Sequence, residues 1–173
     1  MTLTRRASFL LMALTVLLAT DVAHGQARSV IVNGVRLSDG QVNALQQQYG
    51  VRIHDGDYWY DARVGAWGSR GGPTVGFIVP GLALGGPLRL DASNGNTGVV
   101  INGRELHGLD VARLQQVMPV YRGSYWMDAS GNFGLVGGSM IGNLWALSQR
   151  SGGRREGILS TYDKTGAVVI GGR

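Results

Sequence analysis

The sequence contains no cysteine, and Lys164 is the single lysine among its 16 basic residues. The absence of cysteine excludes disulfides, thiol nucleophiles and thiolate metal ligands. The chain also has no Gly-x-x-x-x-Gly-Lys phosphate loop, no His-Glu-x-x-His zinc motif and no Gly-x-Ser-x-Gly nucleophile elbow. We therefore expect a fold held by its packed core, with no catalytic residue, no metal ion and no cofactor.

Long hydrophobic runs are also scarce, and the clearest one, residues 9–19, stands near the N-terminus. Arg5 and Arg6 precede it and small residues follow it, which is the three-part order of a secretory signal peptide. The run is shorter than the roughly 20 residues of a membrane-spanning helix, and a retained N-terminal anchor is the alternative. We predict a signal peptide over residues 1–26, a periplasmic or secreted protein, and no transmembrane span after cleavage.

Glycine is abundant, with 29 residues, and the formal net charge is +5. The basic residues are dispersed, except for a group at Arg150, Arg154 and Arg155. A nucleic-acid-binding surface normally gathers its cations on one face, so this dispersion argues against a nucleic-acid partner. Affinity for the anionic material of a cell envelope stays open as an alternative.

The chain contains an internal duplication. Residues 33–47 align with residues 102–116, and residues 56–62 align with residues 123–129. The two copies share an Asn-Gly dipeptide, a Tyr-Trp-x-Asp motif and a series of glycines in matching order. Such repeats usually bury a core by packing one unit against the next. We therefore predict two copies of one structural unit.

Each copy has the pattern of a hairpin, a helix and a second hairpin. Asn33-Gly34 stands between two short apolar strands, and this dipeptide suits a tight two-residue hairpin turn. Ser38 predicts the start of a helix, with Gln41 completing a capping box, and Gly50 predicts its end. The second copy repeats this order, and Pro119 ends its helix.

The second hairpin of each copy begins with an aromatic strand, residues 58–61 or 125–128, and returns through Trp67 or Phe133. These patterns predict an α+β fold with mostly antiparallel strands and two short helices. We expect the two tandem hairpin–helix–hairpin units to pack as one pseudo-twofold domain, because a unit of this size buries little surface alone.

The predicted boundaries follow from the duplication. The first unit with its connector covers residues 27–98, and the second unit covers residues 99–149. Within the connector, residues 77–86 are apolar and predict a buried strand and turn. Residues 150–173 predict a basic turn followed by a C-terminal hairpin.

The aromatic strands carry the candidate binding site. Side chains alternate along a strand, so Tyr58 and Tyr60 share one face while Trp59 and Asp61 share the other. Exposed tryptophans would give two related platforms for a sugar ring or a peptide, whereas buried ones would belong to the core. The candidate ligand-binding residues are Tyr58, Trp59, Asp61, Trp67, Tyr125, Trp126, Asp128 and Phe133.

Two further readings concern carboxylates. Asp61 and Asp128 occupy equivalent positions, and a pseudo-symmetric pair of carboxylates is one way to build a hydrolase. Both aspartates also suit the start of a turn, which is the simpler role. Asp55, Asp57 and Asp61 lack the spacing of an EF-hand loop, so we predict no calcium site.

The motifs Asn33-Gly34, Tyr58-Trp59-Tyr60-Asp61 and Gly65-Ala66-Trp67-Gly68 resemble those of a group of uncharacterised exported bacterial proteins. The resemblance covers most of the chain after residue 26 and implies no known activity. We expect a non-enzymatic binding module of the bacterial envelope, whose partner is a cell-wall glycan, peptidoglycan or another envelope protein. A self-assembling structural envelope protein is the first alternative, and the hydrolase is the second. Ligand identity and oligomeric state stay open.

Overall fold

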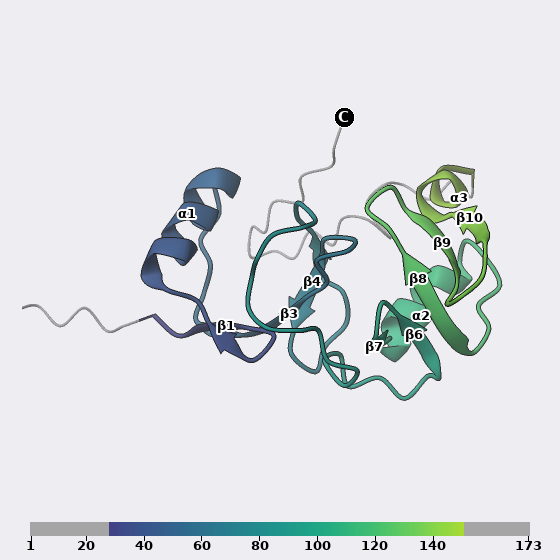
Figure 1. Ribbon diagram of the computed structural model, residues 1–173, viewed down its shortest axis with the longest axis horizontal. Coiled ribbons are helices and arrows are strands. Elements are labelled where there is room, and N and C mark those ends of the chain that lie inside the picture. Colours follow the sequence, from purple (N-terminus) through teal and green to yellow (C-terminus); the bar gives the residue numbers. More distant parts are fainter. Residues whose placement is uncertain (1–27, 151–173) are drawn as a thin grey trace, which may run out of the picture.

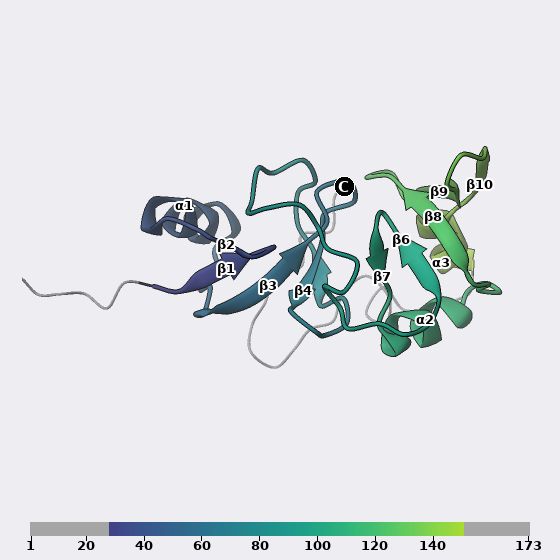
Figure 2. The same cartoon turned by 60° about the horizontal axis from the view of Figure 1, so that its bottom comes forward.

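The computed structural model describes residues 28–150. The predicted signal peptide, residues 1–26, and the predicted C-terminal hairpin lie outside the described residues. The described part is an α+β fold with two five-stranded, mostly antiparallel sheets and three short helices. The two sheets lie side by side along the long axis of the molecule (Figure 1). They are also separate when the molecule is viewed from another direction (Figure 2). The predicted α+β class is confirmed.

The first sheet has the strand order β2-β1-β3-β4-β5. Its strand β1 pairs in parallel with β3, and the other neighbours are antiparallel. The elements are β1 Val30–Val32, β2 Val35–Arg36, α1 Asp39–Tyr49, β3 Gly56–Tyr60, β4 Ala66–Ser69 and β5 Gly76–Phe77.

The second sheet has the order β10-β9-β8-β6-β7, which is the same arrangement built from later elements. Here too the first strand of the sheet, β6, pairs in parallel with β8. The elements are β6 Val99–Ile101, β7 Arg104–Glu105, α2 Gly108–Gln115, β8 Gly123–Met127, β9 Asn132–Leu135, β10 Met140–Asn143 and α3 Leu144–Arg150. The last helix, α3, is one more than the two helices predicted.

The Asn-Gly turns form as predicted and also hold the parallel strands together. Asn33 and Gly34 have φ of 48° and 77°, and Asn102 and Gly103 have φ of 51° and 88°. These positive values are those of a type I′ turn, which matches the twist of the hairpin. The Asn33 side chain donates to the carbonyl of Tyr60 at 2.8 Å and accepts from its N–H at 3.0 Å. The turn asparagine thereby extends the β1–β3 ladder by one residue.

Helix α1 has the ends that the sequence predicts. The Ser38 side chain accepts from the Gln41 N–H while the Gln41 side chain accepts from the Ser38 N–H, so the capping box is complete. Gly50 ends the helix in the left-handed conformation, with φ of 63°. Helix α2 begins differently, because the ring Nδ1 of His107 accepts from the N–H of Leu109 at 3.1 Å.

Each sheet has two faces, which we name by the helix that follows its first hairpin. The helix face of the first sheet carries Tyr58, Tyr60 and Trp67, which pack with α1. Its far face carries Trp59 and Ala66. In the second sheet, Tyr125, Met127 and Phe133 lie on the helix face, and Trp126 lies on the far face.

The larger core cluster joins the two sheets. It combines Trp59 and Ala66 from the far face of the first sheet with Met127 and Phe133 from the helix face of the second. The contact therefore brings two different faces together. A twofold axis would bring the same face of each unit together, so the structure does not confirm the predicted pseudo-twofold packing.

The connector between the sheets is less regular than predicted. Only Gly76–Phe77 forms a strand, and residues 78–98 follow in turns and irregular segments. Leu82 and Leu84 nevertheless pack against the core beside α1. Within residues 28–150, no helix is both long and apolar enough to cross a membrane.

Candidate functional site

The largest hollow described lies between α1 and the helix face of the first sheet. Its volume is about 360 Å³, which falls at the lower end of the range for small-molecule sites. We call it the α1 groove. Its floor comes from strands β1, β3 and β4, and its wall comes from Leu45 and Tyr49 of α1. The lining is mainly aliphatic and aromatic.

Three aromatic side chains of the sheet line the α1 groove. Tyr58 and Trp67 meet edge to face, with ring centroids 6.2 Å apart. The Tyr58 hydroxyl donates to the carbonyl of His54 at 3.0 Å. The buried Tyr60 hydroxyl donates to the carbonyl of Val79 at 2.7 Å. Burial raises the pKa of both tyrosines, and for Tyr58 the charge of Asp55 raises it further.

Tyr49 differs from these tyrosines because its hydroxyl is buried without a hydrogen-bond partner among the described residues. It is the last residue of α1 and its side chain is 8% exposed. Leaving a buried hydroxyl unpaired costs about 1–3 kcal/mol. The ring of Tyr49 therefore lines the α1 groove, while its hydroxyl is buried away from the open space of the groove. Arg52 and His54 lie exposed on the segment that borders it.

The second sheet has a corresponding groove beside α2, with a volume of about 220 Å³. Tyr125 and Phe133 line it at the positions equivalent to Tyr58 and Trp67. Met118 and Met127 stand at the places of Tyr49 and Tyr60, so this groove keeps the counterpart of Tyr58 but lacks those of the other two tyrosines. The same hollow in both sheets indicates that it belongs to the unit, while Tyr49 and Tyr60 distinguish the α1 groove.

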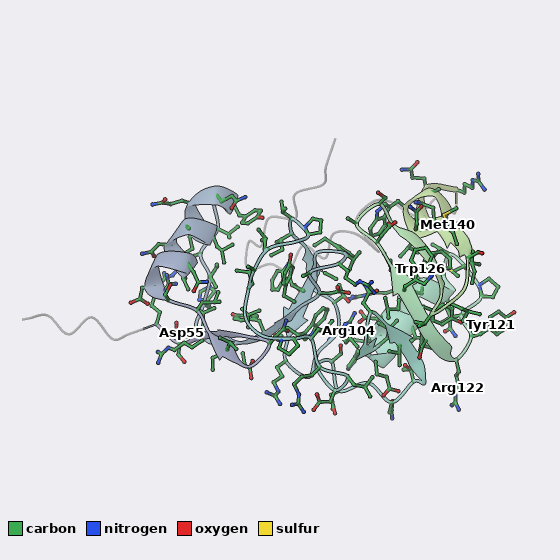
Figure 3. The ribbon with its side chains drawn as sticks, viewed as in Figure 1. Asp55, Arg104, Tyr121, Arg122, Trp126 and Met140 are labelled. Carbon is green, nitrogen blue, oxygen red and sulfur yellow. The ribbon has the colours of Figure 1, made fainter. Side chains whose placement is uncertain are left out.

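A buried polar cluster lies at the junction of the sheets, centred on Arg104 of β7 (Figure 3). Its guanidinium pairs with Asp110 at 3.2 Å and lies over the Trp59 ring, 3.9 Å from the centroid. Its Nη1 also donates to the Ser93 hydroxyl. Burial lowers the pKa of Arg104, although Asp110 opposes this. Thr74 completes the cluster, since its N–H and hydroxyl both donate to Asp110.

The two candidate aspartates take separate structural roles. Asp61 is buried, accepts from the N–H of Arg63 at 2.9 Å and accepts from the Asn102 side chain at 2.9 Å. Asp128 accepts from the N–H groups of Ser130 and Asn132, at 2.9 and 3.0 Å. Both therefore stabilise the turn after their strand, and no hydrogen bond joins them within residues 28–150.

The two candidate tryptophans differ in exposure. Trp59 is 1% exposed and lies in the core beneath Arg104. Trp126 is only partly buried. Each donates its indole N–H to a carbonyl of the following glycine turn, Gly72 at 3.2 Å or Gly138 at 3.3 Å. The pair therefore does not present two equivalent platforms.

The sequence reasoning did not single out Tyr49 or Arg104. Tyr49 shares a helix face with Val42 and Leu45, and this periodicity was the available signal for a lining residue. Arg104 has no such signal, because the equivalent position in the first copy is Val35. No group of three His, Asp or Glu side chains in the described part of the chain is arranged to hold a metal ion.

Comparison with curated proteins finds two plant relatives from Arabidopsis thaliana. Extra-large guanine nucleotide-binding protein 1 is 37% identical over 111 residues, which are 62% of this chain and 12% of that protein. Extra-large guanine nucleotide-binding protein 2 is 32% identical over 125 residues, which are 69% of this chain and 14% of that protein. The chain thus spans about one eighth of the length of these relatives. No known protein-family profile matches it, and no solved structure matches it either.

These relatives correct the expectations drawn from the bacterial resemblance. The matched proteins are plant guanine nucleotide-binding proteins, so the assignment to uncharacterised exported bacterial proteins is wrong. The predicted envelope-binding function falls with it, together with its structural and hydrolytic alternatives. The predicted signal peptide and the periplasmic or secreted location, which rested on the pattern of the N-terminal residues, are contradicted by these relatives as well.

Proposed function

We propose that this chain is a small-molecule-binding module whose site is the α1 groove. The ligand has an apolar body and one hydrogen-bonding group. The observation that carries the proposal is a groove of about 360 Å³ with a mainly apolar, aromatic lining, bordered by the exposed side chains of Arg52 and His54. Pockets that bind small molecules typically combine an apolar lining with a few polar groups that fix orientation.

The lining residues have separable roles in this proposal. Tyr58 and Trp67 form a fixed aromatic wall, because each ring holds the other in an edge-to-face contact. The Tyr60 hydroxyl is occupied by Val79 and Leu82, so it keeps the floor in place rather than meeting a ligand. Tyr49 forms part of the α1 wall with its ring. Of the eight residues predicted from the sequence, we keep Tyr58 and Trp67 for this site.

We also propose that residues 28–98 and 99–149 are two copies of one unit stacked front to back. The shared strand order and the paired grooves support this organisation. The far face of the first copy then covers part of the helix face of the second, which leaves the α1 groove as the larger one. This stacking replaces the twofold arrangement expected from the sequence.

The names of the relatives assign guanine nucleotide binding to those proteins. We propose that the part they share with this chain serves as an accessory ligand-binding unit and does not hold the nucleotide. The lack of a phosphate loop and the single lysine, Lys164, support this division of roles.

The test uses 1-anilinonaphthalene-8-sulfonate as the probe, because it has an aromatic body and a charged sulfonate group. We expect saturable binding to the full chain, followed by energy transfer from tryptophan to the probe. Leu45→Trp fills the α1 groove and should abolish binding, whereas Leu114→Trp fills the equivalent position of the second groove and should not. Circular dichroism in the near and far ultraviolet confirms that each variant is folded. Equal binding to folded Leu45→Trp contradicts the proposal.

A further inference from the structure

We propose that the far face of the second sheet, around Trp126, binds a β-hairpin of a partner protein that lays an arginine side chain on the indole ring. The inference does not depend on the α1 groove. It follows from a comparison of two equivalent faces within this chain, of which one is covered and the other is not.

The far face of the first sheet, which is covered, shows which side chain packs on its tryptophan. On the far face of the first sheet, Arg104 lies over the Trp59 ring at 3.9 Å, and burial of both groups makes such a cation–π contact stronger than it is in water. Arg104 belongs to the β6–β7 hairpin, directly after the turn Asn102-Gly103. The hairpin therefore presents its arginine to the tryptophan.

The same hairpin makes a second contact with the covered face. The Asn102 side chain donates to the Asp61 carboxylate at 2.9 Å. The two anchors, Trp59 and Asp61, stand two residues apart on one face of β3 and just beyond its end. A tight Asn-Gly-Arg hairpin is thus recognised at two points, one for the amide and one for the guanidinium.

The second sheet repeats both anchors. Trp126 lies opposite Gly134 in the β8–β9 pair, as Trp59 lies opposite Gly68 in the β3–β4 pair. Asp128 follows β8 at the place of Asp61 and, like it, accepts from the N–H two residues later. The backbone therefore holds the second tryptophan in the geometry of the first. Asp128 differs from Asp61, because its second carboxylate oxygen accepts from the Asn132 side chain at 3.0 Å, where that of Asp61 accepts from Asn102.

The described residues 28–150 leave the second face uncovered around Trp126. Trp126 is partly exposed, and no ring or cation contact to it occurs within residues 28–150, whereas Trp59 is 1% exposed. Met140 stands at the place of Thr74 and is 60% exposed. Figure 3 shows Trp126 and Met140 on the second sheet, away from Arg104 at the junction. This is a rigid aromatic anchor with an apolar neighbour and an acidic one.

A second copy of this chain fits the face poorly. In the first hairpin, the position equivalent to Arg104 is Val35, so no arginine is presented. The Asn33 side chain is also engaged already, because its Nδ2 donates to the carbonyl of Gly86 at 3.1 Å. The partner is therefore a different protein, one whose exposed hairpin carries the Asn-Gly-Arg sequence.

The experiment uses the full chain labelled with ¹⁵N and a cyclic peptide with the sequence of residues 98–107 as the probe. The indole N–H signal of Trp126, assigned with Trp126→Phe, reports binding at the face. We expect a saturable shift of this signal. The peptide with Arg104→Gln should bind at least tenfold more weakly, and a cyclic peptide of residues 29–38, which has Val35 in place of the arginine, should not bind.

Three results overturn the proposal. The Trp126 signal does not move up to millimolar peptide, or the Arg104→Gln peptide binds as tightly as the parent, or the unliganded chain self-associates in sedimentation through Trp126. Because the decisive substitution is in the peptide, the test holds even if a Trp126 variant fails to fold. Trp126→Leu, where folded, should lower the peptide affinity at least tenfold.

Discussion

Arg104 shows how much a single buried side chain determines in this molecule. Its guanidinium is enclosed by Asp110, Ser93, Thr74 and the Trp59 ring, and its side chain is 5% exposed. Burial alone lowers its pKa, but the adjacent carboxylate favours the charged form. The charge is therefore retained inside the protein because a matched anion is buried with it.

Replacing this arginine should destabilise the fold strongly. Arg104→Met removes the buried partner of Asp110 and leaves it only the longer ion pair to the partly exposed Arg113, at 3.7 Å. The loss of one partner of a buried pair costs about 3–5 kcal/mol. Urea unfolding followed by circular dichroism measures the change. Arg104→Met combined with Asp110→Leu removes both charges and should recover much of the loss. A single variant within about 1 kcal/mol of the parent would contradict this account.

The tyrosines of the α1 groove should make stability fall at high pH. Burial raises the pKa of Tyr58 and Tyr60 above the ordinary value of 10.0, so the fold favours their protonated forms. Their contribution is fully present below pH 10 and is lost as the pH rises through the raised values. Absorbance at 295 nm should show two tyrosines that ionise above pH 10. Titration of all tyrosines at or below pH 10 would be inconsistent with this burial.

At the residue scale, sequence alone gave part of the candidate site. Tyr58 and Trp67 do line the α1 groove. The alternation of side chains along a strand places Trp59 on the opposite face from Tyr58 and Tyr60. It cannot predict which face is buried, because residues of the second sheet, such as Arg104 and Met127, take part in covering Trp59. Equivalent tryptophans consequently end in different surroundings.

At the scale of single elements, the Asn-Gly hairpin does more than reverse the chain. The Asn102 side chain bonds the backbone of Met127 at both its N–H and its carbonyl, at 3.0 and 2.9 Å, as Asn33 bonds Tyr60. The turn therefore fixes the register of the parallel strand pair. The asparagine that suits the positive φ of the turn thus also joins the two strands, and we call its pair of side-chain hydrogen bonds the asparagine clamp.

Removing this clamp should weaken both sheets without straining the turns. Asn33→Gly and Asn102→Gly keep the positive φ but lose the side-chain hydrogen bonds, and each should cost about 1–2 kcal/mol. Asn94→Gly is the matched control, since Asn94 also has positive φ, 51°, and is exposed. Thermal unfolding compares the three. Equal effects at all three positions would show that backbone freedom, and not the clamp, is responsible.

The hairpins and the first helix were predictable because their signals are local. Asn-Gly turns, the capping box at Ser38 and the stop at Gly50 all act within a few residues. The parallel pairing of β1 with β3 was not predictable, because it joins segments separated by α1. Helix α3 also escaped prediction, since glycines precede it and its N-terminal residues include Trp145, which packs on Phe77 at 5.3 Å.

At the scale of the whole molecule, one core cluster spans both sheets. Trp59 and Ala66 of the first share it with Met127, Phe133 and Leu144 of the second. Neither half can lose its structure without exposing apolar surface of the other. The two sheets should therefore unfold as one cooperative system, despite their similar and separate strand orders.

The contact between Phe77 and Trp145 offers a test of this coupling. The parent should show coincident urea transitions by tryptophan fluorescence and by far-ultraviolet circular dichroism. Phe77→Ala removes the edge-to-face contact across the junction and should cost about 2 kcal/mol, with the two transitions beginning to separate. Val35→Ala, at an exposed position, is the control and should leave both unchanged. Separate transitions in the parent would refute the coupling.

The connector makes the surroundings of the two Asn-Gly turns different. On the helix face of the first sheet, the Asn33 side chain reaches the carbonyl of Gly86, where its counterpart Asn102 reaches Asp61. Gly85, with φ of 67°, lies so close to Val32 that any side chain would collide with its carbonyl. The chain thus blocks with its own backbone the place where a preceding copy would dock. Duplication of the unit can therefore add copies after the second sheet. A copy added before the first sheet would need the place that the connector already occupies.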